Sequence, residues 1–264
     1  IAFDIKKKKL CEKVIGYSRR IETMKKALKK GIIDDYSENP EEVIKNADFL
    51  ILATPITILE EYIKLIRDVN PEITFTDVGS VKKIVCDKVK KILGKKANFI
   101  GSHPISGSEK SGIDSIKEGL FENRIVVLTP TENTDRVVKK KVKSFWEKLG
   151  STTVFMSPEE HDKILGFTSH LPHFLVYTLL FTGNKNKKIM KNNFGPGFLD
   201  TTRIGKSNPE MWTEIFLSNK KNLTLWVEKF EKELRNFKKY LKNNEVEKLK
   251  KVLNESKFFR EKIE

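Results

Sequence analysis

The stretch Phe49-Leu50-Ile51-Leu52-Ala53 is an uninterrupted apolar run that ends at Thr54-Pro55. Such a run is typical of a strand buried on both faces of a parallel sheet, and proline stops it because it has no N–H for the ladder. After the proline, apolar residues recur three or four positions apart, at Ile58, Leu59, Tyr62, Leu65 and Ile66. The sequence therefore predicts a buried strand followed by a helix, the repeating unit of α/β proteins.

The same alternation extends outward from this unit. Strands are expected at residues 14–17, 73–77, 99–100, 125–128 and 152–155, and helices at 21–30, 81–93 and 134–149. This order predicts a Rossmann-like, doubly wound parallel sheet in residues 1–156, whose ligands lie beyond the carboxyl ends of the strands. After Ser157-Pro158 the β pattern stops, and residues 157–264 are expected to form an all-helical second domain.

The last helical stretch carries one apolar stripe with residues three or four apart: Leu223, Trp226, Phe230, Leu234, Phe237 and Leu241. A narrow stripe of large apolar side chains is typical of a helix that packs against another protein surface. We expect this face to contact a partner subunit or a neighbouring helix.

Composition limits the location and chemistry of the protein. Of the 264 residues, 38% are hydrophobic and 33% charged. Because no apolar run approaches the ~20 residues that span a bilayer, and no signal-peptide order opens the chain, we expect a cytoplasmic protein without a membrane partner. Cys11 and Cys86 lie far apart, with no His or Cys at metal-ligand spacing, so neither a disulfide framework nor a zinc site is expected.

The net charge of +15 raises the possibility of a nucleic-acid partner. However, 43 of the 51 cationic residues are lysine, whereas base reading and phosphate clamps favour arginine. The lysine runs at 6–9 and 139–141 also lack interleaved aromatic residues for base stacking. We therefore expect no nucleic-acid partner, and a solvated basic surface that attracts an acidic metabolite.

Ser18-Arg19-Arg20 follows the strand expected at 14–17, where a dinucleotide-binding domain meets the adenosine ribose. Arginine there suits the extra phosphate of NADP and an acid would suit NAD, so NADP is favoured, although two solvated arginines at a helix start remain an alternative. The G-x-G-x-x-G fingerprint is absent from the sequence, so the first strand and its glycine loop either are missing or lie outside residues 1–264. The expected cofactor-binding residues are Ser18, Arg19, Arg20, Thr54, Pro55 and Asp77.

Gly101-Ser102-His103-Pro104-Ile105-Ser106-Gly107 follows the apolar pair Phe99-Ile100 and predicts a loop at the end of a strand. An imidazole that titrates near neutral pH is suited to proton transfer at pH 7. His103 is therefore a candidate acid–base residue.

Four segments together resemble the prephenate/arogenate dehydrogenase family of tyrosine biosynthesis. They are residues 76–82, TDVGSVK; 101–107, GSHPISG; 169–173, SHLPH; and 198–204, FLDTTRI. The resemblance implies oxidative decarboxylation of prephenate to 4-hydroxyphenylpyruvate: hydride leaves ring C4 for NAD or NADP, the C4 hydroxyl becomes a carbonyl, and carbon dioxide departs as the ring aromatises.

The resemblance also implies roles for individual residues. His103 matches the catalytic histidine that accepts the hydroxyl proton, and Ser80 matches a serine near the hydroxyl and the nicotinamide, with a helix N-cap as the alternative. Arg203 matches the arginine that binds a substrate carboxylate. The remaining implied residues are His170 and His173 lining the substrate pocket, and Glu109 and Asp200 in an ion-pair network around Arg203.

Some alternatives remain open. His170 and His173 are three residues apart, which alone would be compatible with a metal, but no third ligand is at recognisable spacing. Trp212 is expected in the core or an interface rather than in contact with substrate. The family's helical domain dimerises, so a homodimer is expected. Arogenate dehydrogenase and a non-catalytic dimeric remnant without its cofactor loop are the competing functions.

Overall fold

The computed structural model describes residues 1–106, 112–131, 133–190 and 193–263. The chain divides into two compact units, Ile1–Asn219 and Lys220–Glu264. The division into domains expected at residue 156 lies within the first unit and stays a prediction.

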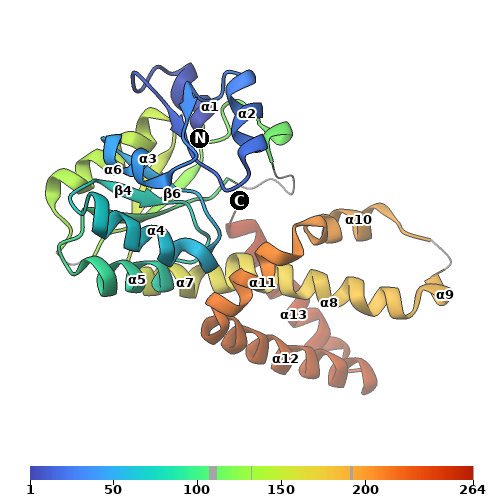
Figure 1. Ribbon diagram of the computed structural model, residues 1–264. Helices are drawn as coiled ribbons and strands as arrows, with labels where there is room; N and C mark the ends of the chain where they lie inside the picture. The colour runs from blue at the N-terminus through green and yellow to red at the C-terminus, as the bar shows by residue number, and fades with distance from the viewer. Residues whose placement is uncertain (107–111, 132, 191–192, 264) are drawn as a thin grey trace. The chain divides into compact units, whose positions relative to one another are not determined.

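The first unit contains a five-stranded sheet in the order β3 (Leu50–Leu52), β4 (Phe75–Asp77), β5 (Phe99–Pro104), β6 (Ile125–Thr129) and β7 (Thr152–Phe155) (Figure 1). Strands β3, β4 and β5 are parallel. A second, two-stranded parallel sheet joins β1 (Ile15–Gly16) to β2 (Asp35–Tyr36). The predicted Rossmann-like α/β fold with a parallel sheet is therefore confirmed.

Two strands, β6 and β7, depart from the predicted parallel arrangement, because they run opposite to the parallel strands β3, β4 and β5. β6 is antiparallel to β5 and parallel to β7. The described part of the 105–124 connection contains only the short 3-10 turn η1 (Ile113–Ser115), and antiparallel neighbours need no crossover helix. The pairing with β6 extends β5 as far as Pro104, so His103 lies in a strand, and the loop predicted there was wrong.

Helices cover both faces of the larger sheet. On one face, α4 (Ile56–Val69) and α5 (Lys83–Leu93) pack around Phe75 and Phe99. On the other, α1 (Ala2–Lys7) and α6 (Arg136–Lys148) pack around Ile100 and Leu128. Because adjacent residues of a strand point to opposite faces, Phe99 and Ile100 enter different cores. Two further helices, α2 (Ile21–Lys29) and α3 (Pro40–Asn46), follow β1 and β2 along the chain.

A continuous helical segment follows the sheet. It comprises α7 (Pro158–Leu165), one π-helical turn η2 (Gly166–His170) and α8 (Leu171–Lys185). Ser157 and Glu160 form a capping box at its start. By length and composition alone this helix could cross a bilayer, with a mean hydropathy of 1.3 and 28% of its most apolar window buried. Its first half nevertheless holds three buried polar side chains that are hydrogen bonded within the protein: His161, Asp162 and His170.

Shorter elements return along α8. They are α9 (Lys187–Met190), α10 (Pro196–Thr202), the 3-10 turn η3 (Arg203–Lys206) and α11 (Pro209–Ser218). At Gly205 a Cβ would lie 2.3 Å from Leu180 Cδ1 and 3.0 Å from Val176 Cγ1. The glycine therefore allows η3 to pack closely on α8, which positions the neighbouring Arg203.

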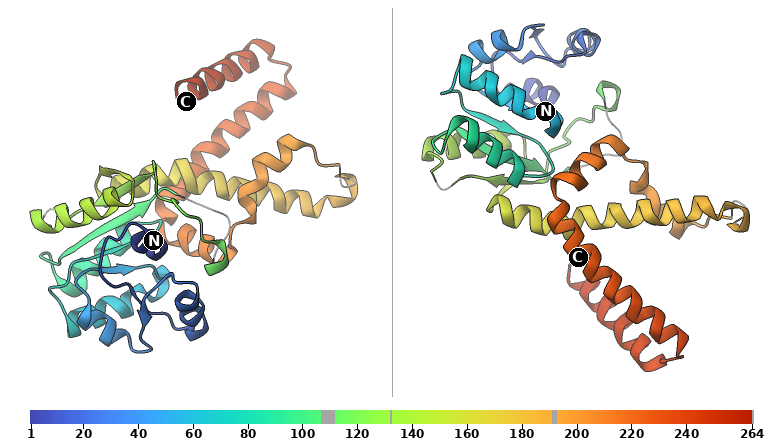
Figure 2. Two further views of the ribbon diagram at one scale, coloured as in Figure 1. Left: turned by 90° about the horizontal axis from the view of Figure 1, so that it is seen from above. Right: turned by 60° about the horizontal axis from the view of Figure 1, so that its bottom comes forward.

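The second unit is a pair of antiparallel helices, α12 (Lys220–Lys242) and α13 (Val246–Lys262) (Figure 2). In the predicted stripe, Leu223 is buried, whereas Leu234 and Leu241 are 58% and 64% exposed. Further large apolar side chains of α13 are exposed, namely Val246, Leu253, Phe258 and Phe259. The helical segment is confirmed, whereas the contact expected for the stripe stays a prediction.

Candidate active site

Three acid–base side chains form a hydrogen-bonded row that begins at His103 on β5. The Nδ1 atom of His103 is 2.8 Å from Nε2 of His161, a fully buried side chain in the first turn of α7. The Nδ1 atom of His161 is 2.7 Å from Oδ1 of Asp162, which is also buried. The row thus links the carboxyl end of β5, the central strand of the sheet, to a carboxylate on the helical segment.

Asp162 also holds the start of α5. Its Oδ1 accepts the backbone N–H of Lys82 at 2.8 Å, and its Oδ2 accepts that of Lys83 at 3.0 Å. These N–H groups have no partners within their own helix, and a carboxylate is favourable at the positive end of the helix dipole. The alternative role of Ser80 as the N-cap is wrong, because α5 begins at Lys83 and Asp162 supplies the acceptors. The catalytic role expected for Ser80, which is half-buried, stays a prediction.

A buried ion pair lies next to this row, between Lys82 and Asp77 at the carboxyl end of β4. Lys82 Nζ also donates to the carbonyl oxygen of Ser102 at 2.9 Å. The Asp77 carboxylate accepts the backbone N–H groups of Gly79 and Ser102 at 2.8 and 3.2 Å. Asp77, expected to bind cofactor, therefore joins β4 to β5 immediately before His103.

The four histidines of the chain all occur in this region. Removal from water lowers the pKa of each ring below its ordinary value. The effect is large for the pKa of His103, which neighbouring His161, Lys82 and His170 lower further. Burial lowers the pKa of His170 to about 4. At pH 7 these rings are therefore neutral, as a proton acceptor must be.

His170 closes the π-helical turn and has no solvent exposure. Asn219 Nδ2 donates to the backbone oxygen of Asp162 at 2.7 Å and lies 3.1 Å from Nδ1 of His170. Because the same amide nitrogen donates to a carbonyl, Nδ1 of His170 acts as an acceptor, and Nε2 carries the proton of the neutral ring. That Nε2 has no hydrogen-bond partner among the described residues.

His173 begins the next turn, and its ring stacks on Trp212 of α11, with centroids 3.5 Å apart and planes at 19°. Trp212 is buried, as expected for a core residue, but this contact places it directly against a predicted site residue. The indole Nε1 of Trp212 also has no hydrogen-bond partner among the residues that the structure describes. Desolvation is the main cause of the lowered pKa of His173, and the positive charge of the nearby Arg203 lowers this pKa further.

The other substrate-binding residues lie around the end of α10. Arg203 is an exposed residue at the start of η3, and Asp200 is exposed on α10. Glu109, the other acid expected near Arg203, lies outside the described residues. The structure thus brings together His103, His161, His170, His173 and Arg203, and the ion-pair network expected for Glu109 and Asp200 stays a prediction.

The expected cofactor residues follow β1 and β3. Ser18 Oγ accepts the N–H of Arg20 at 3.2 Å, just before α2, and both Arg19 and Arg20 are exposed. Thr54, between β3 and the exposed Pro55, has a buried hydroxyl without a hydrogen-bond partner among the described residues. An unpartnered hydroxyl and two exposed guanidinium groups after strands are suited to the hydroxyls and phosphates of a dinucleotide. These residues therefore fit NAD(P).

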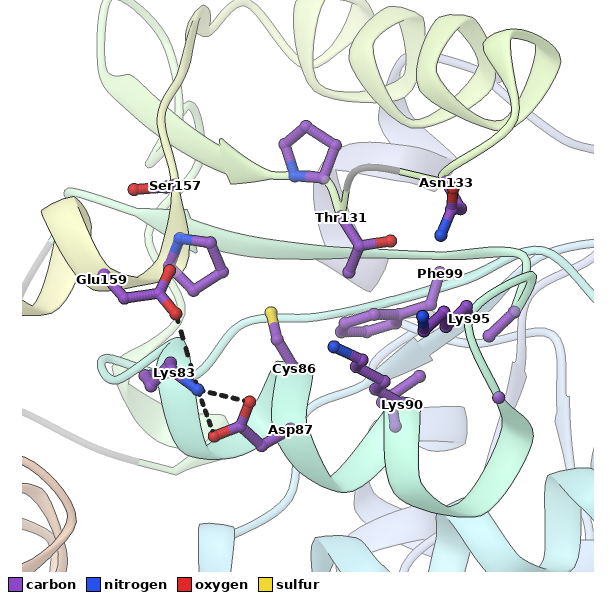
Figure 3. Close-up of a pocket in the computed structure, with 15 residues that line it drawn as sticks. Lys83, Cys86, Asp87, Lys90, Lys95, Phe99, Thr131, Asn133, Ser157 and Glu159 are labelled. Atoms are coloured by element: carbon purple, nitrogen blue, oxygen red, sulfur yellow. Dashed lines mark hydrogen bonds and ion pairs between the residues drawn. The ribbon is translucent and has the colours of Figure 1, made fainter.

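A cavity of about 270 Å³ lies between α5, the loop after β6 and the start of α7 (Figure 3). Lys83, Cys86, Asp87 and Glu159 are among its lining residues, and none of the expected site residues is. Lys83 pairs with Asp87 and Glu159, and burial raises the pKa of Cys86 to about 12. Among the described residues, no three metal-ligating side chains converge here or elsewhere.

Two family models match the chain in succession. The model described as prephenate dehydrogenase, nucleotide-binding domain, matches residues 1–155, and the one described as prephenate dehydrogenase, dimerization domain, matches residues 157–255. The chain belongs to the prephenate dehydrogenase family. The predicted family and its classification as an NAD(P)-dependent oxidoreductase are thereby confirmed.

Individual relatives agree with this family. The prephenate dehydrogenase of Bacillus subtilis is 33% identical over 99% of this chain and 72% of its own length. That of Lactococcus lactis is 34% identical over 89% of this chain and 65% of its own length. An Aquifex aeolicus prephenate dehydrogenase structure, in complex with hydroxyphenyl propionate and NAD+, has a TM-score of 0.92 and 37% identity, covering 100% of this chain and 93% of that one.

A related substrate preference also occurs among the structural neighbours. Synechocystis arogenate dehydrogenase has a TM-score of 0.82 and 29% identity, covering 100% of this chain and 95% of that chain. Prephenate and arogenate differ in their side chain, and the ring that reacts is the same in both.

Proposed function

We propose that this chain is a prephenate dehydrogenase, with His103 as the group that accepts the C4 hydroxyl proton while hydride leaves the same carbon. The observation that supports this role is the neutral imidazole of His103, held against His161 beside His170. Hydride removal from a carbon bearing a hydroxyl requires a proton acceptor within hydrogen-bond reach of that hydroxyl.

The overall reaction releases no net proton. His103 accepts the hydroxyl proton, hydride departs from C4, and loss of the ring carboxylate as carbon dioxide leaves a phenolate. The phenol product then needs one proton on that oxygen, and His103 returns it. When bound, NAD(P)+ supplies the hydride acceptor.

Prephenate has two carboxylates, and the site offers several donors for them. Arg203 can hold a carboxylate through two parallel hydrogen bonds, and the Nε2–H of His170 and the Nε1–H of Trp212 are buried donors without described partners. A buried donor without a partner is unfavourable, so an acceptor oxygen of the substrate is a suitable partner. His173, stacked on Trp212, contacts the pyruvyl side chain in this proposal.

For the cofactor, the proposal retains the preference for NADP that Arg19 and Arg20 indicate. Both guanidinium groups are exposed after β1 and can meet a 2′-phosphate. Ser18, Thr54 and Pro55 line the remainder of the cofactor site, and Asp77 supports it through its bonds to β5.

The proposal includes a homodimer formed through the helical part of the chain. The support is the match to a family model described as a dimerization domain and the exposed apolar residues of α8, α12 and α13: Leu179, Phe181, Leu234, Leu241, Leu253 and Phe258. Burial of such surface contributes roughly 25 cal/mol per Å². A cytoplasmic location stays a prediction.

The experiment that tests this function compares substrates and cofactors with the purified protein. Prephenate and arogenate are each mixed with NADP+ or NAD+, and kcat/KM is measured from formation of the reduced nicotinamide. The proposal expects the highest kcat/KM with prephenate and NADP+. Higher kcat/KM with arogenate would assign the alternative activity, and no turnover together with no cofactor binding would favour a non-catalytic dimer.

A further inference from the structure

His161 and Asp162 are not among the residues that the four family-like segments supply. His161 contacts the Nδ1 atom of His103, and Asp162 contacts the other ring nitrogen of His161. We infer that His161 and Asp162 are positioning residues that fix the tautomer of His103 and share the proton it takes from substrate. This inference rests on the proposed function of His103. It gives His161 a role in the reaction in addition to its place in the core.

The hydrogen-bond directions follow from the carboxylate end of the row. Asp162 accepts the N–H groups of Lys82 and Lys83, and its Oδ1 is 2.7 Å from Nδ1 of His161. A carboxylate only accepts hydrogen bonds, so Nδ1 of His161 donates and Nε2 of the neutral ring is an acceptor. His103 Nδ1 must therefore donate its proton across the 2.8 Å contact. Nε2 of His103 is left with a free lone pair, the form a proton acceptor needs.

The same row can hold the proton during the reaction. When Nε2 of His103 gains the substrate hydroxyl proton, the Nδ1 proton of His103 can pass to Nε2 of His161. His161 then has two N–H groups and a positive charge beside the Asp162 carboxylate. Transfer in reverse restores the Nδ1 proton of His103, and Nε2 of His103 then gives its proton to the phenolate oxygen of the product. The row therefore neither gains nor loses a proton over one complete turnover.

The charges around the row explain why Asp162 is needed for this. Lys82 disfavours positive charge on both His103 and His161, and the ring of His170 disfavours it on His103, whereas Asp162 and Asp77 favour it on His161. Lys82 is neutralised by its ion pair with Asp77, which leaves Asp162 as the carboxylate in direct contact with a ring. Moving the charge to His161 places it next to that carboxylate in a buried region, where electrostatic attraction is stronger than in water.

The tautomer is measurable without substrate or cofactor. The chain has four histidines, so ring-nitrogen NMR of histidine-labelled protein at neutral pH gives four rings, assigned by single substitutions. We expect His103 and His161 each to carry the proton on Nδ1 and a bare Nε2, with the opposite tautomer for His170. A proton on Nε2 of neutral His103 would overturn the inference.

Kinetics separate tautomer control from proton sharing. In His161→Gln, the amide oxygen can still accept from Nδ1 of His103 but the side chain cannot take up a proton, so we expect the tautomer to persist and kcat to fall about 10-fold. In His161→Leu both functions are lost, and we expect a mixed tautomer and a fall in kcat of about 100-fold or more, with KM within about 3-fold. A kcat within about 2-fold of the parent in His161→Leu would overturn the inference.

Glu160→Gln is the matched control, because it weakens the α7 capping box one residue away without touching either ring. It should lower stability and leave kcat and the His103 tautomer unchanged. If His161→Leu does not fold, the kcat of His161→Gln and the tautomer of His103 in the parent protein still test the inference. Failure of the proposed function gives a different result, namely the expected tautomers with no turnover of prephenate.

Discussion

Lys82 and Asp77 form a buried ion pair, and the same lysine donates to the carbonyl oxygen of Ser102, directly before His103. Removal of one partner leaves an uncompensated buried charge, so Lys82→Met should lower the free energy of unfolding by about 3–5 kcal/mol. Urea unfolding measures this loss.

The neighbouring Lys83 provides the control, since its pairs with Asp87 and Glu159 are largely exposed. Exposed pairs contribute little, so Lys83→Met should change the free energy of unfolding by no more than about 1 kcal/mol. An equal loss of unfolding free energy in the two variants would contradict the larger contribution expected from the buried Lys82 pair.

Stability should fall in mild acid because of the buried histidines. The pKa of His170 is about 4 in the folded chain, against 6.5 when unfolded. Below pH 6.5 the unfolded chain binds more protons, so the free energy of unfolding decreases as pH falls, and His170 alone accounts for about 3 kcal/mol once pH is below both values. Urea unfolding at a series of pH values should show this loss, and His170→Gln should reduce it; an unchanged pH dependence would contradict the assignment.

Arg203 should determine substrate affinity rather than the chemical step. Arg203→Lys keeps the charge but loses the planar pair of donors, so we expect KM for prephenate to rise about 10-fold or more with a smaller change in kcat. Arg67→Lys, at an exposed arginine paired with Asp68, is the control and should leave KM unchanged. A larger fall in kcat than rise in KM for Arg203→Lys would instead place Arg203 in the reaction step.

Cofactor preference should depend on the residues after β1. Arg20→Asp introduces an acid that can accept from the ribose 2′-hydroxyl and repels a 2′-phosphate, so the ratio of kcat/KM for NADP+ to that for NAD+ should fall about 10-fold or more. Initial rates with each cofactor measure the ratio. If the ratio is the same before and after the change, Arg20 does not contact the cofactor.

Local pattern and motif order were enough to predict the α/β alternation, the helical second part and the family, and the roles of the individual site residues stay predictions. The strand containing His103 was not predictable in the same way, because its extension depends on pairing with β6 more than 20 residues away. Glycine, serine and proline favour a loop locally, and the tertiary pairing overrides that preference.

His161 and Lys82 were missed for a similar reason. In the sequence His161 is one polar residue in the first turn of a capped helix, and its partner His103 is 58 positions away. Lysine is ordinarily exposed, so nothing local identifies Lys82 as buried. The end of the β pattern after Ser157-Pro158 indicated a helical part, but not which of its side chains faces β5.

The most direct test of the central claim measures both products of prephenate turnover. With prephenate labelled at its ring carboxylate, we expect one labelled carbon dioxide for each reduced nicotinamide. In His103→Asn, both should fall about 10²–10⁴-fold while cofactor affinity is unchanged. Reduced nicotinamide without labelled carbon dioxide, or undiminished turnover in His103→Asn, would contradict the account.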